Sequence, residues 1–310
     1  MTIGFSSLPQ VVIDYVRDIF ARANDKISRA IIDQPALHEP TIDNLLILEL
    51  TVSPPAFFAR EQVAVSIETH WLGGRWMYDR FEIADIALFI TLRRQGQLGE
   101  RKVALLQTKR LYSRDIPMAD LDAADFAIGI GRLVDRPEPL RPLFHQRAFA
   151  FTPASTYDAT ASGHEQIGRI DAYMKTLGLP VYYGLYNPLE VPFQGVSPAA
   201  PAATRRLPNT TGCRILPADI MHEVINTLPA GRSPSFADLT LTAPIDAGDA
   251  DSIHGWRLER FVADEVLRCR QGRLFDQTMD PNLDALLYRR TAPITAAIQV
   301  TIDFGADGGG

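Results

Sequence analysis

The sequence predicts an α/β domain in which a central sheet is flanked by helices. Apolar residues recur at steps of three and four near the N-terminus, which is typical of amphipathic helices. From Gln62 the apolar residues alternate with smaller or polar ones, as in strands. The later chain then alternates helix-like and strand-like segments, and such alternation is typical of sheets that helices cover.

Two helices are predicted before the first strand. Residues 8–33 carry an apolar stripe with charged residues between, and Pro35 ends the pattern. Residues 41–51 carry closely spaced leucines up to the break that begins at Ser53. Neither helix shows an obvious chemical group, so both are interpreted as scaffold.

Three strands are predicted next. Val63–Ile67 alternates between apolar and small or polar residues, whereas Phe81–Ile90 is apolar on both faces beyond Asp85. The polar residues 93–101 separate this run from Val103–Lys109, another largely apolar run. The last two runs are expected to form adjacent antiparallel strands joined by a loop.

The remaining elements complete the expected domain. Strands are predicted at 147–151 and 179–186, and helices at 119–134, 165–177, 217–228 and 256–270. We divide the chain into an N-terminal helical segment (1–55), a core (56–230), a C-terminal helical extension packed on that core (231–304) and a disordered tail (305–310).

Composition limits the function classes. The net charge of −6 argues against a protein that coats nucleic acid with uniform positive charge, but an active-site cleft needs only local positive charge. Cys213 and Cys269 form no disulfide framework. The sequence contains no run of eighteen apolar residues and no pattern of a signal peptide, so we expect a cytoplasmic protein without a membrane span.

One polar constellation interrupts the apolar runs. Gln107 and Lys109 lie two residues apart on a strand, and such residues project to the same face. An amide and an ammonium at the end of a core strand are costly to bury without partners. Asp85, on the neighbouring predicted strand, is placed to supply one. A structural ion pair at a sheet edge is the alternative interpretation.

These residues resemble the PD-(D/E)XK nuclease superfamily, most closely its Mrr-like restriction branch, in which glutamine often replaces the third acid. Asp85 matches the first aspartate, Gln107 the acid-or-glutamine position, and Lys109 the lysine. The resemblance covers about residues 60–190 and implies a restriction-endonuclease-like fold, a mixed central β-sheet flanked by helices. A further acid often precedes the aspartate.

The resemblance implies a magnesium-dependent endonuclease that cleaves DNA phosphodiester bonds, with manganese as a substitute metal and a role in defence against phage or foreign DNA. Asp85, the Gln107 amide oxygen and the Thr108 peptide carbonyl are the expected metal ligands. Lys109 is expected to orient the attacking water and to offset developing negative charge. Glu68 and Glu82 both remain candidates for the further acid.

Three basic residues near the constellation are expected to contact nucleic acid: Lys102, Arg110 and Arg114. The expected partners are DNA and either a second copy of the chain or a sensor protein of a defence system. The competing hypothesis is a catalytically silent nuclease-like fold that serves as a nucleic-acid-binding or assembly module.

Overall fold

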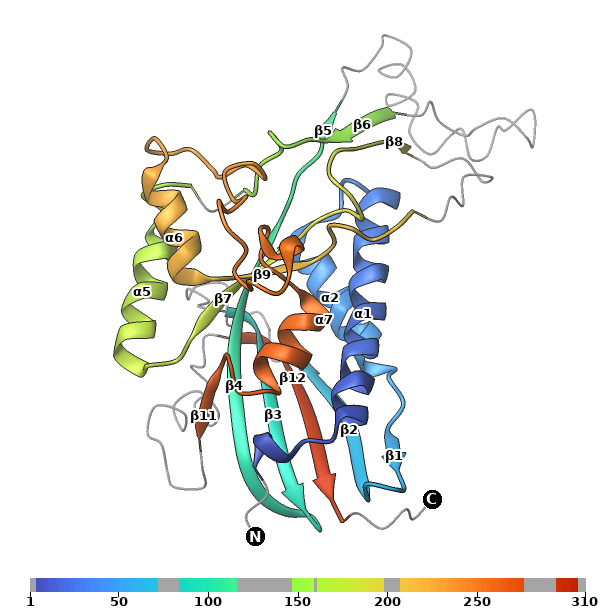
Figure 1. Cartoon of the computed structure of the whole chain (residues 1–310). Helices are drawn as coiled ribbons and strands as arrows, with labels where there is room; N and C mark the ends of the chain where they lie inside the picture. The colour runs from blue at the N-terminus through green and yellow to red at the C-terminus, as the bar shows by residue number, and fades with distance from the viewer. Residues whose placement is uncertain are drawn as a thin grey trace, which may run out of the picture.

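The computed structural model describes residues 4–71, 84–115, 147–158, 161–197, 207–275 and 294–305. Within these residues the chain forms an α/β fold whose mixed central sheet has helices on both sides, as the sequence predicts (Figure 1). The predicted helix 119–134 and the tail beyond Gly305 lie outside the described residues.

The helices cover the two faces of the sheet unequally. The longest is α1, and together with α2 and α7 it lies on one side, while α5 and α6 lie on the other (Figure 1). Their bounds are α1 Gln10–Asp33, α2 Glu39–Thr51, α5 Glu165–Leu177, α6 Ala218–Thr227 and α7 Leu258–Arg260, with short helical turns at η1 Phe5–Ser7, η2 Ala250–Ser252 and the π-helical η3 Phe261–Val266.

The strands of the described residues form two sheets. Nine belong to the central sheet, namely β1 Ala56–Phe58, β2 Val63–Trp71, β3 Ala84–Arg94, β4 Gln97–Arg110, β7 Val181–Tyr186, β9 Arg214–Pro217, β10 Trp256–Arg257, β11 Arg273–Phe275 and β12 Ile294–Phe304. The other three, β5 Arg114–Asp115, β6 Arg147–Phe151 and β8 Phe193–Ser197, make a small separate sheet.

The central sheet runs in the order β1-β2-β12-β3-β4-β7-β9-β10, and β11 pairs with β4 outside this path. β3 and β4 form the expected antiparallel hairpin. Its turn consists of Gln95 and Gly96, with φ angles of 50° and 76°. A two-residue hairpin turn of this kind requires left-handed backbone at both residues. Both strands therefore extend into the polar residues 93–101, which the sequence assigned to a loop.

The C-terminal region differs most from expectation. Residues 231–304 are not a helical extension, because β12 lies inside the sheet, antiparallel to β2 and parallel to β3. The predicted helix 256–270 is helical only over α7 and η3, from Leu258 to Val266, and its first two residues form the short strand β10. The sequence analysis assigned no strand to residues 294–304. Local patterns do not report pairing with strands as distant in the sequence as β2 and β3.

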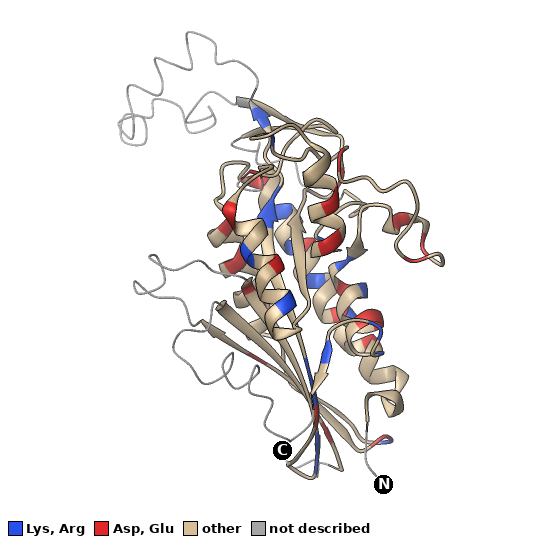
Figure 2. Cartoon of the chain, turned by 90° about the vertical axis from the view of Figure 1, so that its left-hand side faces the viewer, with Lys and Arg blue, Asp and Glu red and all other residues tan. Residues whose placement is uncertain are grey.

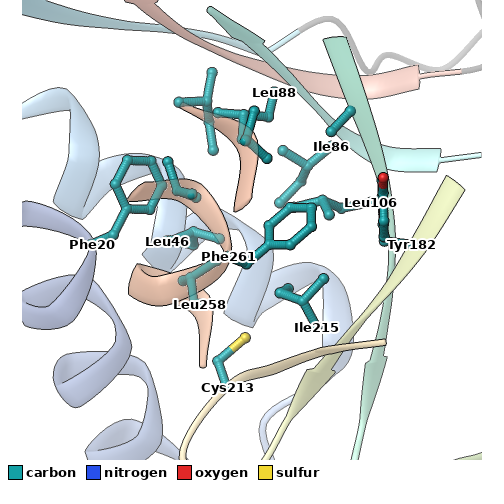
Figure 3. Packing of buried hydrophobic residues seen from close by; sticks show 14 of the residues in the cluster. Phe20, Leu46, Ile86, Leu88, Leu106, Tyr182, Cys213, Ile215, Leu258 and Phe261 are labelled. Atoms are coloured by element: carbon teal, nitrogen blue, oxygen red, sulfur yellow. The ribbon is translucent and has the colours of Figure 1, made fainter. Parts of the chain in front are cut away.

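The main hydrophobic core fills the space between the sheet and the helices α1, α2 and α7 (Figure 3). Phe261 lies near its centre and contacts the Tyr182 ring edge-on at 4.8 Å between centroids. The side chains around it come from distant segments of the chain, with Phe20 from α1, Leu46 from α2, Leu88 from β3 and Leu106 from β4. This packing fixes the sheet against α2, which matters for the site below.

Among the described helices, none combines the length and the apolar composition that crossing a bilayer requires.

Candidate active site

The polar constellation lies where β3 and β4 stop pairing. The two strands pair from the hairpin turn as far as Ile86 and Leu106. Beyond Leu106, β4 continues to Arg110 and pairs only with β7, on its other side. This end of β4 therefore has one edge without a strand partner among the described residues.

Two carboxylates take the place of the missing strand. The Thr108 backbone N–H donates to Asp85 Oδ2 at 2.6 Å, and the Arg110 N–H donates to Glu39 Oε2 at 3.2 Å. Alternate residues of a strand present their backbone groups to the same edge. The Thr108 peptide carbonyl, the third predicted metal ligand, therefore faces this edge too.

Asp85 is held through one of its two oxygens. Oδ2 accepts hydrogen bonds from the Thr108 N–H and from Gln107 Nε2 at 2.5 Å, and it lies 3.0 Å from Thr108 Oγ1. All hydrogen bonds that the described residues donate to Asp85 go to this oxygen. The structure thus brings Asp85, Gln107 and Thr108 together, as the sequence predicts.

Lys109 joins the same cluster but has a different direct partner. Its side chain is only 4% exposed, and Nζ donates to Glu39 Oε1 at 3.1 Å. The ammonium still acts on Asp85, because its positive charge opposes the rise that burial causes in the pKa of that carboxyl. Asp85 is therefore an electrostatic neighbour of Lys109, and Glu39 is its ion-pair partner.

Glu39 and Asp43 are site residues that the sequence analysis missed. Both come from α2, one turn apart, so they lie on the same face of the helix. Asp43 is 5% exposed; it accepts a hydrogen bond from the Tyr186 hydroxyl at 2.6 Å, and its Oδ2 lies 3.1 Å from Thr108 Oγ1. A signal was present, because Asp43 falls within the apolar stripe formed by Ile42 and Leu46.

The Thr108 hydroxyl bridges two acids. Its oxygen lies 3.1 Å from Asp43 Oδ2 and 3.0 Å from Asp85 Oδ2. A hydroxyl has a single hydrogen and can donate to only one of them. The other contact therefore needs a proton on a carboxyl group, or a cation that draws the two acids together.

The electrostatics of the cluster agree with that conclusion. Burial, followed by the nearby charge of Asp85, raises the pKa of Asp43 well above its usual range. Burial also raises the pKa of Asp85 and of Glu39. Lys109 acts on Glu39 and Asp85, whereas the charges that act on Asp43 are those of Asp85 and Glu39, so the three carboxyl groups repel one another when all are ionised.

The donor set suits a hard divalent cation. Magnesium binds carboxylate and carbonyl oxygens and retains several waters. Asp85 and Asp43 supply carboxylates, and Gln107 Oε1 is a buried carbonyl oxygen without a hydrogen-bond partner in the described part of the chain. Among those residues, no group of three or more Asp, Glu, His or Cys side chains is placed so that it could hold a metal ion. A cation here would therefore depend on one or two carboxylates, on carbonyl oxygens and on water.

Glu68 does not belong to this cluster. β12 lies between β2, which carries Glu68, and β3, and Glu68 pairs in register with Gln299. Its side chain is 62% exposed and lines a separate hollow of about 270 Å³ with residues such as Arg93 and Asp303. The prediction failed because it assumed that β2 and β3 were neighbours. Glu82 lies outside the described residues.

Two of the three predicted nucleic-acid contacts are buried. Lys102 is 2% exposed, and its Nζ donates to the Val266 carbonyl at 2.9 Å. Arg110 is 1% exposed, donates to the Pro35 carbonyl and stacks on Tyr112. Burial lowers the pKa of both groups, and only Arg114 is exposed. The prediction for Lys102 and Arg110 was wrong because proximity to the constellation in sequence does not report whether a basic side chain is accessible.

Acidic and basic positions are interspersed over the helices on the side of the molecule turned to the viewer in Figure 2. This distribution agrees with the net charge of −6. Any attraction for a polyanion must therefore come from a local feature rather than from the field of the whole molecule.

Comparisons of the chain with protein-family models, with curated proteins and with solved structures gave no match.

Proposed function

We propose that the chain is a metal-dependent endonuclease that cleaves DNA phosphodiester bonds, with a restriction-endonuclease-like core. The observation that carries the proposal is the convergence of Asp85, Asp43 and Glu39 with Lys109 at the open edge of β4. This cluster comes in addition to the resemblance of Asp85, Gln107 and Lys109 to the PD-(D/E)XK pattern. Magnesium is the proposed cofactor, with manganese as a substitute.

The proposed roles follow from the contacts. Asp85 Oδ1, Asp43 and Gln107 Oε1 would hold the cation, and the Thr108 carbonyl is a further oxygen on the same edge. When bound, a divalent cation offsets phosphate charge and lowers the pKa of a bound water. Lys109, oriented by Glu39, would donate to the attacking water or to a phosphate oxygen and so stabilise negative charge.

In the proposed site, Asp43 on α2 supplies the carboxylate that glutamine at position 107 does not provide. A single carboxylate at Asp85 would bind a divalent cation weakly. Asp43 supplies a second carboxylate from a different element, within reach of the same Thr108 hydroxyl. In this proposal Asp43 fills the role for which Glu68 and Glu82 are the sequence-based candidates.

A catalytically silent binding or assembly module is the second candidate. It is favoured by the internal hydrogen bonds that already engage Gln107, Thr108 and Lys109. It is also favoured because no group of three or more Asp, Glu, His or Cys side chains among the described residues could hold a metal ion. The two candidates differ in one measurable property, since only the nuclease requires a cation at Asp85.

The test is cleavage of supercoiled plasmid, single-stranded DNA and RNA by purified protein, with Mg²⁺, with Mn²⁺ and with chelator. We expect metal-dependent nicking of plasmid that Asp85→Asn lowers about 100-fold or more. Glu68→Gln is the matched control, because that acid is exposed and away from the cluster, and its rate should equal that of the wild type. Equal nicking by Asp85→Asn, or nicking that chelator does not stop, contradicts the proposal.

A further inference from the structure

A hydrogen-bonded chain leads from the surface of α5 to the central sheet. Asp171 Oδ1 lies 2.6 Å from His222 Nδ1, and His222 Nε2 lies 2.9 Å from the Tyr183 hydroxyl. Asp171 is 54% exposed on its side chain, His222 only 5%, and Tyr183 is completely buried. The three residues come from α5, α6 and β7, on the sheet face opposite α2.

The protons of this chain can be assigned from its ends. A carboxylate only accepts, so His222 Nδ1 carries the hydrogen and donates it to Asp171. In the neutral ring Nε2 is then the acceptor, and the Tyr183 hydroxyl donates to it. Burial, with the nearby charges of Asp171 and Asp85, raises the pKa of Tyr183, so the phenol retains its proton.

Tyr183 lies beside Gln107. The two residues are register partners on the parallel strands β7 and β4. Side chains of paired residues stand next to each other on one face of a sheet. Gln107 therefore lies between Asp85 on β3 and Tyr183 on β7. Its Nε2 donates a hydrogen bond to Asp85.

Burying this chain of polar groups carries a desolvation cost that its hydrogen bonds must offset. Three polar groups are ordered, and two of them are removed from water, where apolar residues of the same size would pack without needing partners. The site described above does not use Asp171 or His222. The chain fixes the position of the Tyr183 ring, and the register partners of Tyr183 in the sheet are Gln107 on β4 and Leu216 on β9, of which only Gln107 is polar.

We propose that Tyr183, held by His222 and Asp171, is a positioning residue for Gln107. It keeps the amide in the orientation in which Nε2 donates to Asp85 and Oε1 remains available to a cation or a water. The cation part of this inference rests on the proposed function, whereas the positioning of the amide does not.

The first test observes the amide directly in the metal-free protein. The side-chain amide signal of Gln107 in a ¹⁵N–¹H spectrum is assigned by its loss in Gln107→Glu, and its shift is compared among variants. Tyr183→Phe removes one hydroxyl. Tyr182→Phe is the matched control, because Tyr182 is equally buried and hydrogen-bonded to Gln271, but it is on the opposite face of the same strand.

We expect Tyr183→Phe to shift or broaden the Gln107 amide signal, and Tyr182→Phe to leave it in place. His222→Gln keeps an acceptor for Tyr183 and should displace the signal less than His222→Leu. Equal changes from Tyr183→Phe and Tyr182→Phe, or no change from either, overturn the proposal. Thermal melting of each variant identifies any that fail to fold, and the His222 pair then provides the result.

The second test measures Mn²⁺ affinity from the electron paramagnetic resonance of free Mn²⁺. Tyr183→Phe should weaken Mn²⁺ binding roughly tenfold, as the loss of an outer-shell partner does. The same change should have no further effect in Gln107→Ala. Equal losses in both backgrounds would show that Tyr183 does not act through Gln107. Failure of the wild type to bind Mn²⁺ would contradict the proposed nuclease while the amide signal still decides the positioning.

Discussion

Val103–Leu106 and Gln107–Arg110 are consecutive stretches of one strand, and every residue in both is at most 3% exposed. The first stretch is apolar and belongs to the hydrophobic core. The second carries an amide, a hydroxyl, an ammonium and a guanidinium, each with a polar partner. Burial is equal, so burial alone does not distinguish a core from a site.

The difference lies in what each half contributes. Burial of apolar side chains lowers the free energy of the folded state, whereas the interactions of buried polar groups at best offset the cost of their desolvation. Val103–Leu106 therefore stabilises the fold, whereas the burial of Gln107–Arg110 with its charged partners lowers the net stability. Substitutions in the two halves should separate stability from activity.

The largest expected effect is on activity in the polar half. Lys109→Met should lower plasmid nicking by about 10³-fold, because the ammonium that offsets phosphate charge is gone. It also leaves Glu39 without its ion pair. Lys109→Met/Glu39→Gln should therefore recover stability in denaturant titrations without recovering nicking. Recovery of nicking in the double variant would remove Lys109 from the chemistry.

In the apolar half, Leu106→Ala should lower the free energy of unfolding by about 3 kcal/mol. Leu106 is 3% exposed and lies in the main core, so the deletion leaves a cavity. Urea unfolding measures the loss. Nicking per folded molecule should change little, and a loss of nicking beyond the unfolded fraction would show that the two halves are not separable.

Asp43→Asn should stabilise the metal-free protein by about 2 kcal/mol at neutral pH, while it lowers nicking. The asparagine N–H₂ supplies the hydrogen that Thr108 Oγ1 lacks, so that hydroxyl can donate to Asp85. The Tyr186 hydroxyl keeps an acceptor. Thermal melting in the presence of chelator measures the gain in stability. A less stable variant would contradict the conclusion that the negative charge of the three acids is not fully offset in the metal-free protein.

The same stabilisation should depend on pH. Folding raises the pKa of Asp43, so this group favours the folded state at low pH, and that contribution is lost as the pH rises through the folded-state pKa. The difference in melting temperature between Asp43→Asn and the wild type should be small at about pH 4 and grow toward pH 8. Saturating Mn²⁺ should reduce it. A difference that does not vary with pH would assign it to packing.

The smallest effect is expected from Gln107→Glu. An added carboxylate should tighten Mn²⁺ binding several-fold and retain nicking, whereas Gln107→Leu should lose both. Unchanged cleavage by the leucine variant would exclude Gln107 from the site.

The elements that the sequence predicted correctly are those defined by local patterns. The β3–β4 pair, β7, α1 and α5 follow from periodicity, and Gly178 ends α5 in left-handed backbone with a φ of 63°. Asp85, Gln107 and Lys109 were identifiable because polar residues interrupt apolar strands. Such interruptions are rare enough to indicate a role.

What the sequence did not predict depends on contacts between distant segments. Glu39 and Asp43 were overlooked because α2 was interpreted as scaffold, and their approach to β4 exists only after α2 packs on the sheet. Glu68 was misplaced because β12 separates β2 from β3, and no local pattern reports the neighbour of a strand.

The position of β12 also sets the order of events during synthesis. Gln299 on β12 reaches Thr91 on β3 across 208 residues of chain. A ribosome that adds about 5–20 residues per second needs on the order of 10–40 s to cover that distance. Throughout this interval the apolar strands β2 and β3 exist without the strand that joins them, and unpaired edges of this kind recruit other chains. The nascent protein should therefore depend on chaperones until β12 has been synthesised.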